Sequence, residues 1–125
     1  MKKGIRAKYV DGFVLAVPKR NIVAYLRMAR MGAKIWLEHG ALEFRECVGD
    51  DMAVKMGMPF PRMMKTKPNE TVVFSWITFK SRAHRDTVNA KVMKDARLGD
   101  MNPKTMPFDM KRMAYGGFKI LVDAN

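Results

Sequence analysis

The most apolar part of the chain is residues 71–79, a nine-residue run in which only Ser75 and two threonines are polar. An unbroken series of β-branched and aromatic residues predicts a strand that is buried on both faces. Residues 8–17 predict another strand, and its stretch 13–17 is also apolar on both faces. Pro18 ends this strand because proline cannot donate to the hydrogen-bond ladder.

Two segments follow the helical period instead. Over residues 19–39, apolar side chains recur on one side while arginines and lysines occupy the other, which predicts an amphipathic helix ended by Gly40. His39 is interpreted as a capping residue, since a positive charge is favourable at the negative end of the helix dipole. Ser81 is a suitable N-cap for a second helix over residues 82–94.

The remaining two strands have individual patterns. Residues 41–49 alternate, and Glu46 falls on the same face as three apolar residues, which is typical of a strand near a sheet edge. The last predicted strand, residues 111–123, contains Gly116 and Gly117. Paired glycines inside a strand indicate a bulge or a close approach of another group.

The resulting order, β-α-β-β-α-β, is the ferredoxin-like split βαβ arrangement, and it predicts one α+β domain over residues 1–125. In that topology the first and third strands lie at the centre of a four-stranded antiparallel sheet, with both helices on one face. These are the two strands that are apolar on both sides, so the second face also needs a cover. A second copy of the chain supplies it, and we therefore predict a homodimer in the form of a dimeric α+β barrel.

A long loop separates the second and third strands. Residues 50–69 contain three prolines and five methionines. Loops of this length are usually functional or disordered, and the apolar content argues against disorder. We expect this Met-rich and Pro-rich loop to fold over the domain as a lid.

The chain carries a net charge of +12, and its basic residues are spread evenly apart from an N-terminal extension at residues 1–7. Solubility explains such a surface, and non-specific nucleic-acid binding through phosphates is the alternative. The sequence predicts no membrane span and no secretory signal, so we expect a cytoplasmic protein. The single cysteine, Cys47, agrees with a reducing compartment and is interpreted as a small core residue.

Several motifs spread over residues 8–123 resemble the YbaA-like family of small bacterial proteins. They are Tyr9-Val10-Asp11-Gly12-Phe13, Gly40-Ala41-Leu42, Glu46-Cys47, Gly49-Asp50-Asp51, Val73-Phe74-Ser75-Trp76-Ile77, Arg85-Asp86, Met106-Pro107-Phe108-Asp109, Lys111-Arg112-Met113 and Tyr115-Gly116-Gly117-Phe118. The resemblance implies a dimeric α+β barrel of the ferredoxin-like type. It implies no activity, because that family has no established function.

Two groups of polar residues could face the space inside the barrel. One is Glu46 beside Cys47, and the other is Arg112 near Asp109 and Tyr115. A buried carboxylate with an arginine partner can act as a ligand clamp or a general base. The alternative is an ion pair that fixes the strand register.

Cofactor sites have little support in the sequence. Related haem-degrading barrels use a Trp, a His and an Asn; Trp76 and His84 occupy two of these places, but Asp11 stands where the Asn is expected. One cysteine and two histidines without ligand spacing predict no metal site. The methionines could bind Cu(I) through sulfur, but packing of the long loop explains them better. We therefore expect no cofactor.

These observations predict a homodimer that binds a small apolar or anionic molecule in the barrel. The residues expected to line the site are Tyr9, Glu46, Trp76, Arg112 and Tyr115. One alternative is a cofactor-independent enzyme of the monooxygenase or isomerase kind. The other is the non-specific association with RNA or other nucleic acid that the basic surface would favour.

Overall fold

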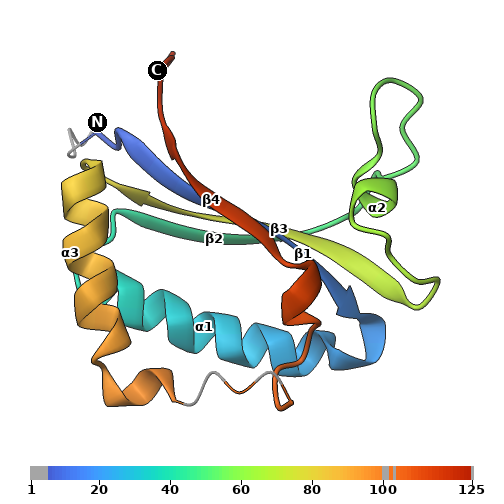
Figure 1. Cartoon of the computed structure of the whole chain (residues 1–125), viewed down its shortest axis with the longest axis horizontal. Helices are drawn as coiled ribbons and strands as arrows, with labels where there is room; N and C mark the ends of the chain where they lie inside the picture. The colour runs from blue at the N-terminus through green and yellow to red at the C-terminus, as the bar shows by residue number, and fades with distance from the viewer. Residues whose placement is uncertain (1–5, 100–101, 103, 125) are drawn as a thin grey trace.

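The computed structural model of the chain describes residues 6–99, 102 and 104–124. Its main elements are β1 (Tyr9–Pro18), α1 (Ile22–Glu38), β2 (Glu43–Val48), β3 (Glu70–Phe79), α3 (Arg82–Met93) and β4 (Ala114–Lys119). The strands form one antiparallel sheet in the order β2-β3-β1-β4, and α1 and α3 cover one face of it (Figure 1). The predicted α+β fold with β1 and β3 at the centre is confirmed. Most of the basic extension at residues 1–7 lies outside the described residues.

Short helices account for the differences from the predicted boundaries. The 3-10 helix η1 (Lys19–Asn21) precedes α1, and η2 (Ala96–Leu98) follows α3. The last strand is shorter than predicted, because residues before it form the 3-10 helix η3 (Met110–Arg112), whose N-cap Asp109 accepts a hydrogen bond from the amide of Lys111. A one-turn helix, α2 (Phe60–Met63), interrupts the long loop.

The predicted helix boundary signals have clear structural causes. The Ser81 hydroxyl accepts a 3.0 Å hydrogen bond from the backbone amide of His84, which confirms it as the N-cap of α3. Gly40 follows α1 with a φ of 114°, a conformation that glycine adopts without a steric penalty. His39 connects the end of α1 to the segment after α3, because its Nε2 lies 2.8 Å from Oδ2 of Asp95.

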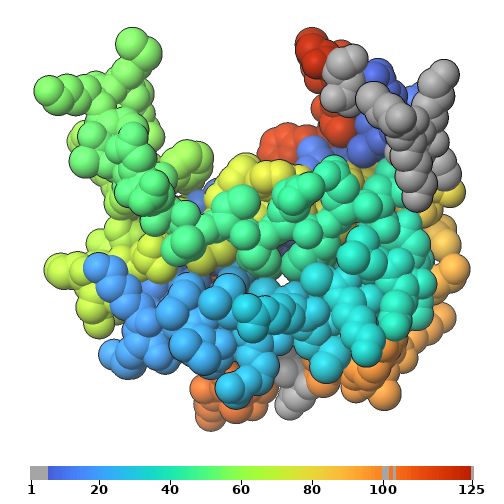
Figure 2. Space-filling model, turned by 180° about the vertical axis from the view of Figure 1, so that it is seen from behind, coloured from blue at the N-terminus to red at the C-terminus, as the bar shows by residue number. Residues whose placement is uncertain are grey.

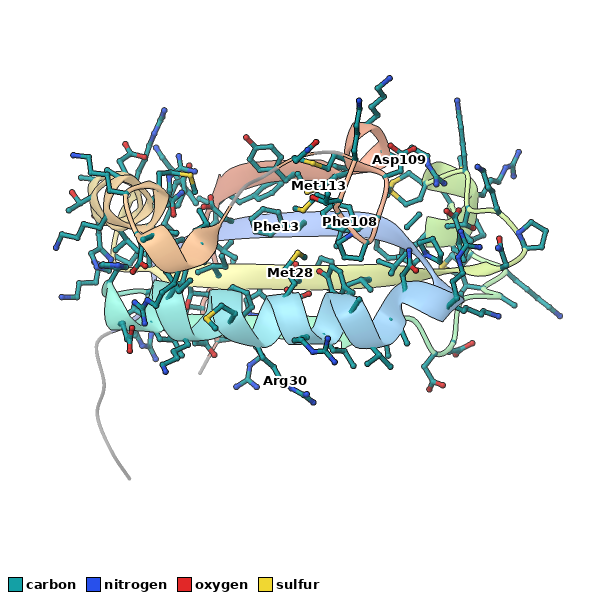
Figure 3. The ribbon with its side chains drawn as sticks, turned by 90° about the horizontal axis from the view of Figure 1, so that it is seen from below. Phe13, Met28, Arg30, Phe108, Asp109 and Met113 are labelled. Atoms are coloured by element: carbon teal, nitrogen blue, oxygen red, sulfur yellow. The ribbon has the colours of Figure 1, made fainter. Side chains whose placement is uncertain are left out.

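The core lies between the sheet and the two helices. One cluster surrounds Ile35, Phe79 and Val92, and a second surrounds Leu15, Tyr25 and Phe108. Phe13, Met28, Phe108 and Met113 lie along this side of the sheet, whereas Arg30 points away from it (Figure 3). The predicted polar side of α1 is confirmed by that arrangement.

The opposite side of the sheet, which we call the open face, carries apolar side chains and no long helix. Its members are the even-numbered residues of β1 and β3 and their register partners, Val10, Val14, Phe74, Trp76, Ala114 and Phe118 among them. Phe74 is 43% exposed and Phe118 is 58% exposed. Both faces of the central strands are therefore apolar, as the sequence predicted.

Two segments rise above the open face at opposite ends of the sheet (Figures 1 and 2). One is the Met-rich loop with α2, where the ring of Phe60 lies 6.3 Å from that of Phe74. The other is the tail after β4, in which Leu121 is 90% exposed and Val122 is 83% exposed. Phe60 thus contacts the open face, but the loop around Met56, which is 92% exposed, rises away from the sheet and does not fold over it as the predicted lid (Figure 1). The part of the open face between the two segments stays accessible.

Gly116 and Gly117 do not form a bulge, since β4 pairs with β1 in an unbroken register from Ala114 to Lys119. The second predicted alternative, a close approach, is confirmed at Gly117, because the phenol ring of Tyr9 occupies the space that a Cβ atom would fill. At Gly116 an added Cβ would make only ordinary contacts, the nearest 3.8 Å from the Phe118 ring.

Gly117→Ala should therefore destabilise the fold by about 1–3 kcal/mol, as expected when an extra methyl group is forced into a packed core. Gly116→Ala should leave the free energy of unfolding unchanged or slightly higher, because it removes a flexible glycine without a clash. Urea unfolding followed by circular dichroism compares the two. Equal stability of both variants would contradict the packing of Tyr9 on Gly117.

Candidate functional site

The five residues predicted to line one ligand site lie in three places. Tyr9, Glu46 and Tyr115 are on the helix-covered face, whereas Trp76 is on the open face. Arg112 was predicted near the start of the last strand, but it lies in η3, before that strand begins. Side chains alternate along a strand, so the register separates residues that are close in the sheet. The five do not converge on a single enclosed space.

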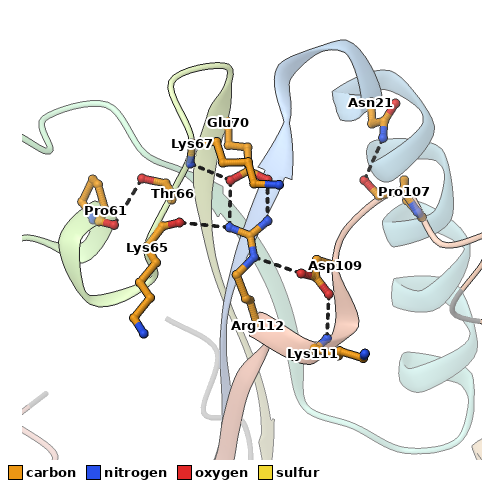
Figure 4. Close-up of polar contacts among 10 residues, drawn as sticks. All are labelled: Asn21, Pro61, Lys65, Thr66, Lys67, Glu70, Pro107, Asp109, Lys111 and Arg112. Atoms are coloured by element: carbon orange, nitrogen blue, oxygen red, sulfur yellow. Dashed lines mark hydrogen bonds and ion pairs between the residues drawn. The ribbon is translucent and has the colours of Figure 1, made fainter.

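Arg112 is the centre of a polar cluster that joins three segments of the chain (Figure 4). Its two terminal nitrogens donate to the carboxylate of Glu70 at 2.8 and 2.6 Å, and its Nε donates to Asp109 at 3.0 Å. A further bond of 3.2 Å reaches the carbonyl of Lys65 in the loop after α2. Arg112 is therefore held in an ion-pair network that links β3, η3 and the loop after α2.

The surroundings of Glu70 show how strong this cluster is. Its side chain is only 4% exposed, and bidentate contact with a guanidinium is the strongest arrangement of such a pair. Hydrogen bonds from Arg112 lower the pKa of Glu70 from its ordinary value of 4.5 to about 2. The Asp109 carboxyl, bonded by the same arginine, also has a lowered pKa.

A pocket of about 280 Å³ opens beside this cluster, at the end of the open face where the loop meets η3. Its lining residues are Met63, Met64, Lys65, Lys111, Arg112, Met113 and Ala114. We call it the methionine pocket. Three thioether side chains make its wall flexible and apolar, and Lys65 and Lys111 add positive charge. The sequence could not have predicted this pocket, because Lys65 and Lys111 lie in segments without a regular hydrophobic pattern.

Glu46 points towards α1 from the edge strand β2. The hydroxyl of Tyr25 donates a 2.8 Å hydrogen bond to its Oε1. Burial raises the pKa of Glu46 despite that bond, and burial beside Glu46 also raises the pKa of Tyr25. Tyr25 was not predicted as a partner of Glu46, although the apolar face of α1 opposite an inward-facing Glu46 would have been the signal for it.

A small pocket of about 100 Å³ adjoins this pair, and we call it the glutamate pocket. It is lined by Ile22, Tyr25, Leu26, Glu46, Cys47, Val48 and Val73. Leu26 and Val48 are exposed, whereas Val73 is buried. The pocket is thus an apolar recess with one carboxyl group in its wall.

A second buried carboxylate, Asp11, has a cationic partner. Nη1 of Arg85 donates to it at 2.8 Å, and the guanidinium carbon of Arg85 lies 5.1 Å from the centre of the Tyr9 ring. Burial raises the pKa of Asp11, although Arg85 opposes that shift. Trp36 donates to Asn89 nearby, at 3.0 Å. The first bond ties α3 to the sheet and the second ties α1 to α3, so Asp11 has a structural partner in Arg85.

The three residues of the haem comparison do not meet. Trp76 lies on the open face, while Asp11 lies on the helix-covered face. Nδ1 of His84 accepts a 2.9 Å hydrogen bond from the backbone amide of Lys80. Within the described part of the chain, no cluster of three or more His, Cys, Asp or Glu side chains could hold a metal ion.

Cys47 differs from its prediction as a core residue, because it lies exposed on the open face of β2. The alternation of an edge strand turns it away from α1, on the side opposite to Glu46.

Over the described residues, no helix has the length and apolarity needed to cross a membrane.

Comparison with known proteins agrees with the sequence resemblance. Residues 8–110 match the model of the DUF1428 family, a family of proteins of unknown function. The uncharacterised protein YbaA of Escherichia coli K12 is 45% identical over 116 residues, which is 93% of this chain and 98% of that protein. YbaA of Shigella flexneri gives the same values. The resemblance to YbaA-like proteins is confirmed.

One solved structure, a dimeric ferredoxin-like protein from an uncultured marine organism, superimposes with a TM-score of 0.57. The match covers 94% of this chain and 99% of that one at 12% sequence identity. At this identity the likeness shows the ferredoxin-like fold alone.

Proposed function

We propose, for a chain that belongs to the DUF1428 family of proteins of unknown function, that it is a homodimeric binding protein for a small anion with an apolar body. Two copies would pair through their open faces, and the ligand would bind in the methionine pocket at the rim of that interface. The observation that carries the proposal is the apolar open face with a partly cationic pocket at its edge.

The dimer is supported by the side chains on the open face. Phe74, Trp76 and Phe118 form a continuous apolar surface with Val10 and Val14, and a face of this kind is typical of an interaction site. The Met-rich loop and the tail rise at its two ends, so a second sheet would lie between them (Figure 2). The marine ferredoxin-like protein, with the same fold, is described as dimeric. Light scattering at micromolar concentration should give twice the chain mass of 14.3 kDa.

The ligand class follows from the charges and side chains of the methionine pocket. Arg112 is neutralised by Glu70 and Asp109, so attraction for an anion would come from Lys65 and Lys111. The three methionines offer contact for an apolar chain that can vary in shape. The overall charge of +12 would raise the local concentration of anions further. A carboxylate with a short alkyl chain fits these features.

Octanoate is a suitable probe, and we expect it to bind in isothermal titration calorimetry and to raise the melting temperature. A double variant, Lys65→Asn with Lys111→Gln, should weaken octanoate binding about tenfold or more, in line with the loss of two charge-assisted contacts. Asparagine is chosen because Lys65 has a φ of 53°, which asparagine tolerates.

The matched control removes two exposed lysines that do not line the pocket, Lys55→Gln with Lys91→Gln. It lowers the net charge equally and should bind octanoate almost as the wild type does. If octanoate binding weakens equally in both double variants, the effect comes from the general surface charge and not from the methionine pocket. If the wild type does not bind octanoate, the proposed ligand class is rejected.

A further inference from the structure

We propose that the glutamate pocket is a second binding site, in which the protonated carboxyl of Glu46 donates a hydrogen bond to the carbonyl oxygen of a small neutral molecule. This site lies on the helix-covered side of the sheet. It therefore stays apart from the open face and from the methionine pocket, and it does not depend on either.

Glu46 is partly buried, without a counter-charge in the described part of the chain. Glu46 forms no ion pair among residues 6–99, 102 and 104–124, although the chain has 24 lysines and arginines. The other two buried carboxylates described above, Asp11 and Glu70, each have an arginine. Removing a carboxylate from water without a cationic partner is costly, so the group is favoured in its neutral form. A neutral carboxyl in a recess is a hydrogen-bond donor.

The hydrogen bond from Tyr25 fixes which oxygen of Glu46 can donate. The Tyr25 hydroxyl donates to Oε1 of Glu46, so that oxygen is already occupied as an acceptor. Tyr25 is itself held by the core, where its ring packs edge-on against Phe108 at 5.8 Å. The proton of the neutral carboxyl is then on Oε2, which leaves one oriented donor for a ligand.

Among the residues that the structure describes, no charged group shifts the pKa of Glu46. Among titratable groups, α1 presents Tyr25 at the pocket, whereas Cys47 of β2 lines it with its thiol turned to the open face. Strand β3 contributes Val73 to the pocket, and Ser75 lies opposite Glu46 in the register. Neither side chain carries a charge. The walls are otherwise the apolar side chains of Ile22, Leu26 and Val48.

The size and shape of the pocket limit the ligand. A volume of about 100 Å³ accepts a small ring or a branched chain of a few carbon atoms, and its exposed edge at Leu26 and Val48 leaves an entrance. Apolar walls with one hydrogen-bonding group are typical of sites for small organic molecules. A cyclic or branched ketone meets both conditions, whereas a carboxylate would place a second negative group beside Glu46 once that residue ionises.

The test uses cyclopentanone, with cyclopentane at equal concentration as the hydrocarbon without an acceptor. Amide shifts in ¹H–¹⁵N NMR spectra of the full chain report binding at Ile22, Leu26 and Val48. We expect cyclopentanone to bind at least fivefold more tightly than cyclopentane at pH 4, below the ordinary carboxyl pKa of 4.5. Binding should weaken as the pH rises through the raised pKa of Glu46, because the ionised group no longer donates.

Two variants make the outcome decisive, and their spectra also show whether each is folded. Glu46→Gln keeps a donor that does not ionise, so cyclopentanone should bind it equally at pH 4 and pH 8. Glu46→Met keeps the volume and should bind the ketone and the hydrocarbon alike. The proposal is overturned if the wild type does not distinguish the two probes, or if Glu46→Gln retains the wild-type pH dependence. Octanoate binding, read at Lys65 and Lys111, should be unchanged in both.

Discussion

Replacing Phe118 by serine should convert the protein from a dimer to a monomer at micromolar concentration. The Phe118 ring lies against Gly12 and Gly116 on the open face, and 58% of the residue is exposed in the single chain. A second sheet would bury that exposed part. Because the twofold pairing uses each residue twice, losing both rings removes about 2–4 kcal/mol of apolar burial. The dissociation constant should rise roughly 30-fold to 1,000-fold.

Tyr115→Ser is the matched control for this variant. Tyr115 is also an exposed aromatic residue of β4, at 68%, but it lies on the helix-covered face, stacked 5.6 Å from Phe13. Its removal should leave the dimer intact. Sedimentation equilibrium over a range of concentrations compares the two variants. A Phe118→Ser protein that dimerises as tightly as the wild type would exclude pairing through the open face.

The dimer prediction depends on the part of the fold that the sequence specified best. The run at residues 71–79 and the stretch at 13–17 lack a polar face, and the structure places both at the centre of the sheet. Alternation in β2 also predicted correctly that Glu46 shares a face with Phe44, but that face is turned towards α1 and not, as predicted for Glu46, towards the space between two sheets. These predictions succeeded because a period of two fixes which face a side chain joins.

The sequence could not predict in the same way which side chains come together in one site. Alternation places Trp76 and Tyr9 on opposite faces of adjacent strands, but only the register shows this, and the register is set by contacts distant in sequence. Arg112 illustrates the same limit. Its partner Glu70 is 42 residues earlier, and the 3-10 helix that directs its side chain depends on an Asp109 cap not recognised in the sequence.

Cys47 shows a different limit. An isolated cysteine in a strand is most often a small core residue, and the prediction followed that preference. The same alternation that turns Glu46 inward turns Cys47 outward, so the period should have outweighed the residue preference. Local pattern was more informative here than the average behaviour of an amino acid.

The largest effect on stability is expected from Arg112→Gln. This change leaves the Glu70 carboxylate buried without its cation and breaks the link to the loop at Lys65. Breaking a buried pair by removing one partner typically costs about 3–5 kcal/mol. For a chain of this size, a loss of about 3 kcal/mol should lower the melting temperature by roughly 10 °C.

Arg97→Gln provides the control. Arg97 also bonds two carboxylates, those of Asp95 and Glu38, but its side chain is 41% exposed. The pair with Glu38 is exposed, and Asp95, which is 11% exposed, keeps its contact with His39. Such pairs contribute about 1 kcal/mol or less, so this variant should melt within a few degrees of the wild type. Differential scanning calorimetry at pH 7 measures both. Similar melting temperatures for the two variants would contradict the importance of the buried pair.

Acid unfolding tests the same cluster through the pKa of Glu70. That pKa is about 2 in the folded chain, below the ordinary value of 4.5, so ionised Glu70 stabilises the fold above pH 4.5. The contribution, about 3 kcal/mol for a shift of this size, should be lost as the pH falls from 4.5 towards 2. Asp109, with its lowered pKa, acts in the same direction. Arg112→Gln lacks the cause of both shifts, so its free energy of unfolding should fall less steeply with acid than that of the wild type. Protonation of Glu70 costs folding stability only in the protein that still has Arg112 as its partner. Parallel curves of unfolding free energy for the two proteins between pH 5 and pH 2 would therefore mean that other carboxylates control the acid stability.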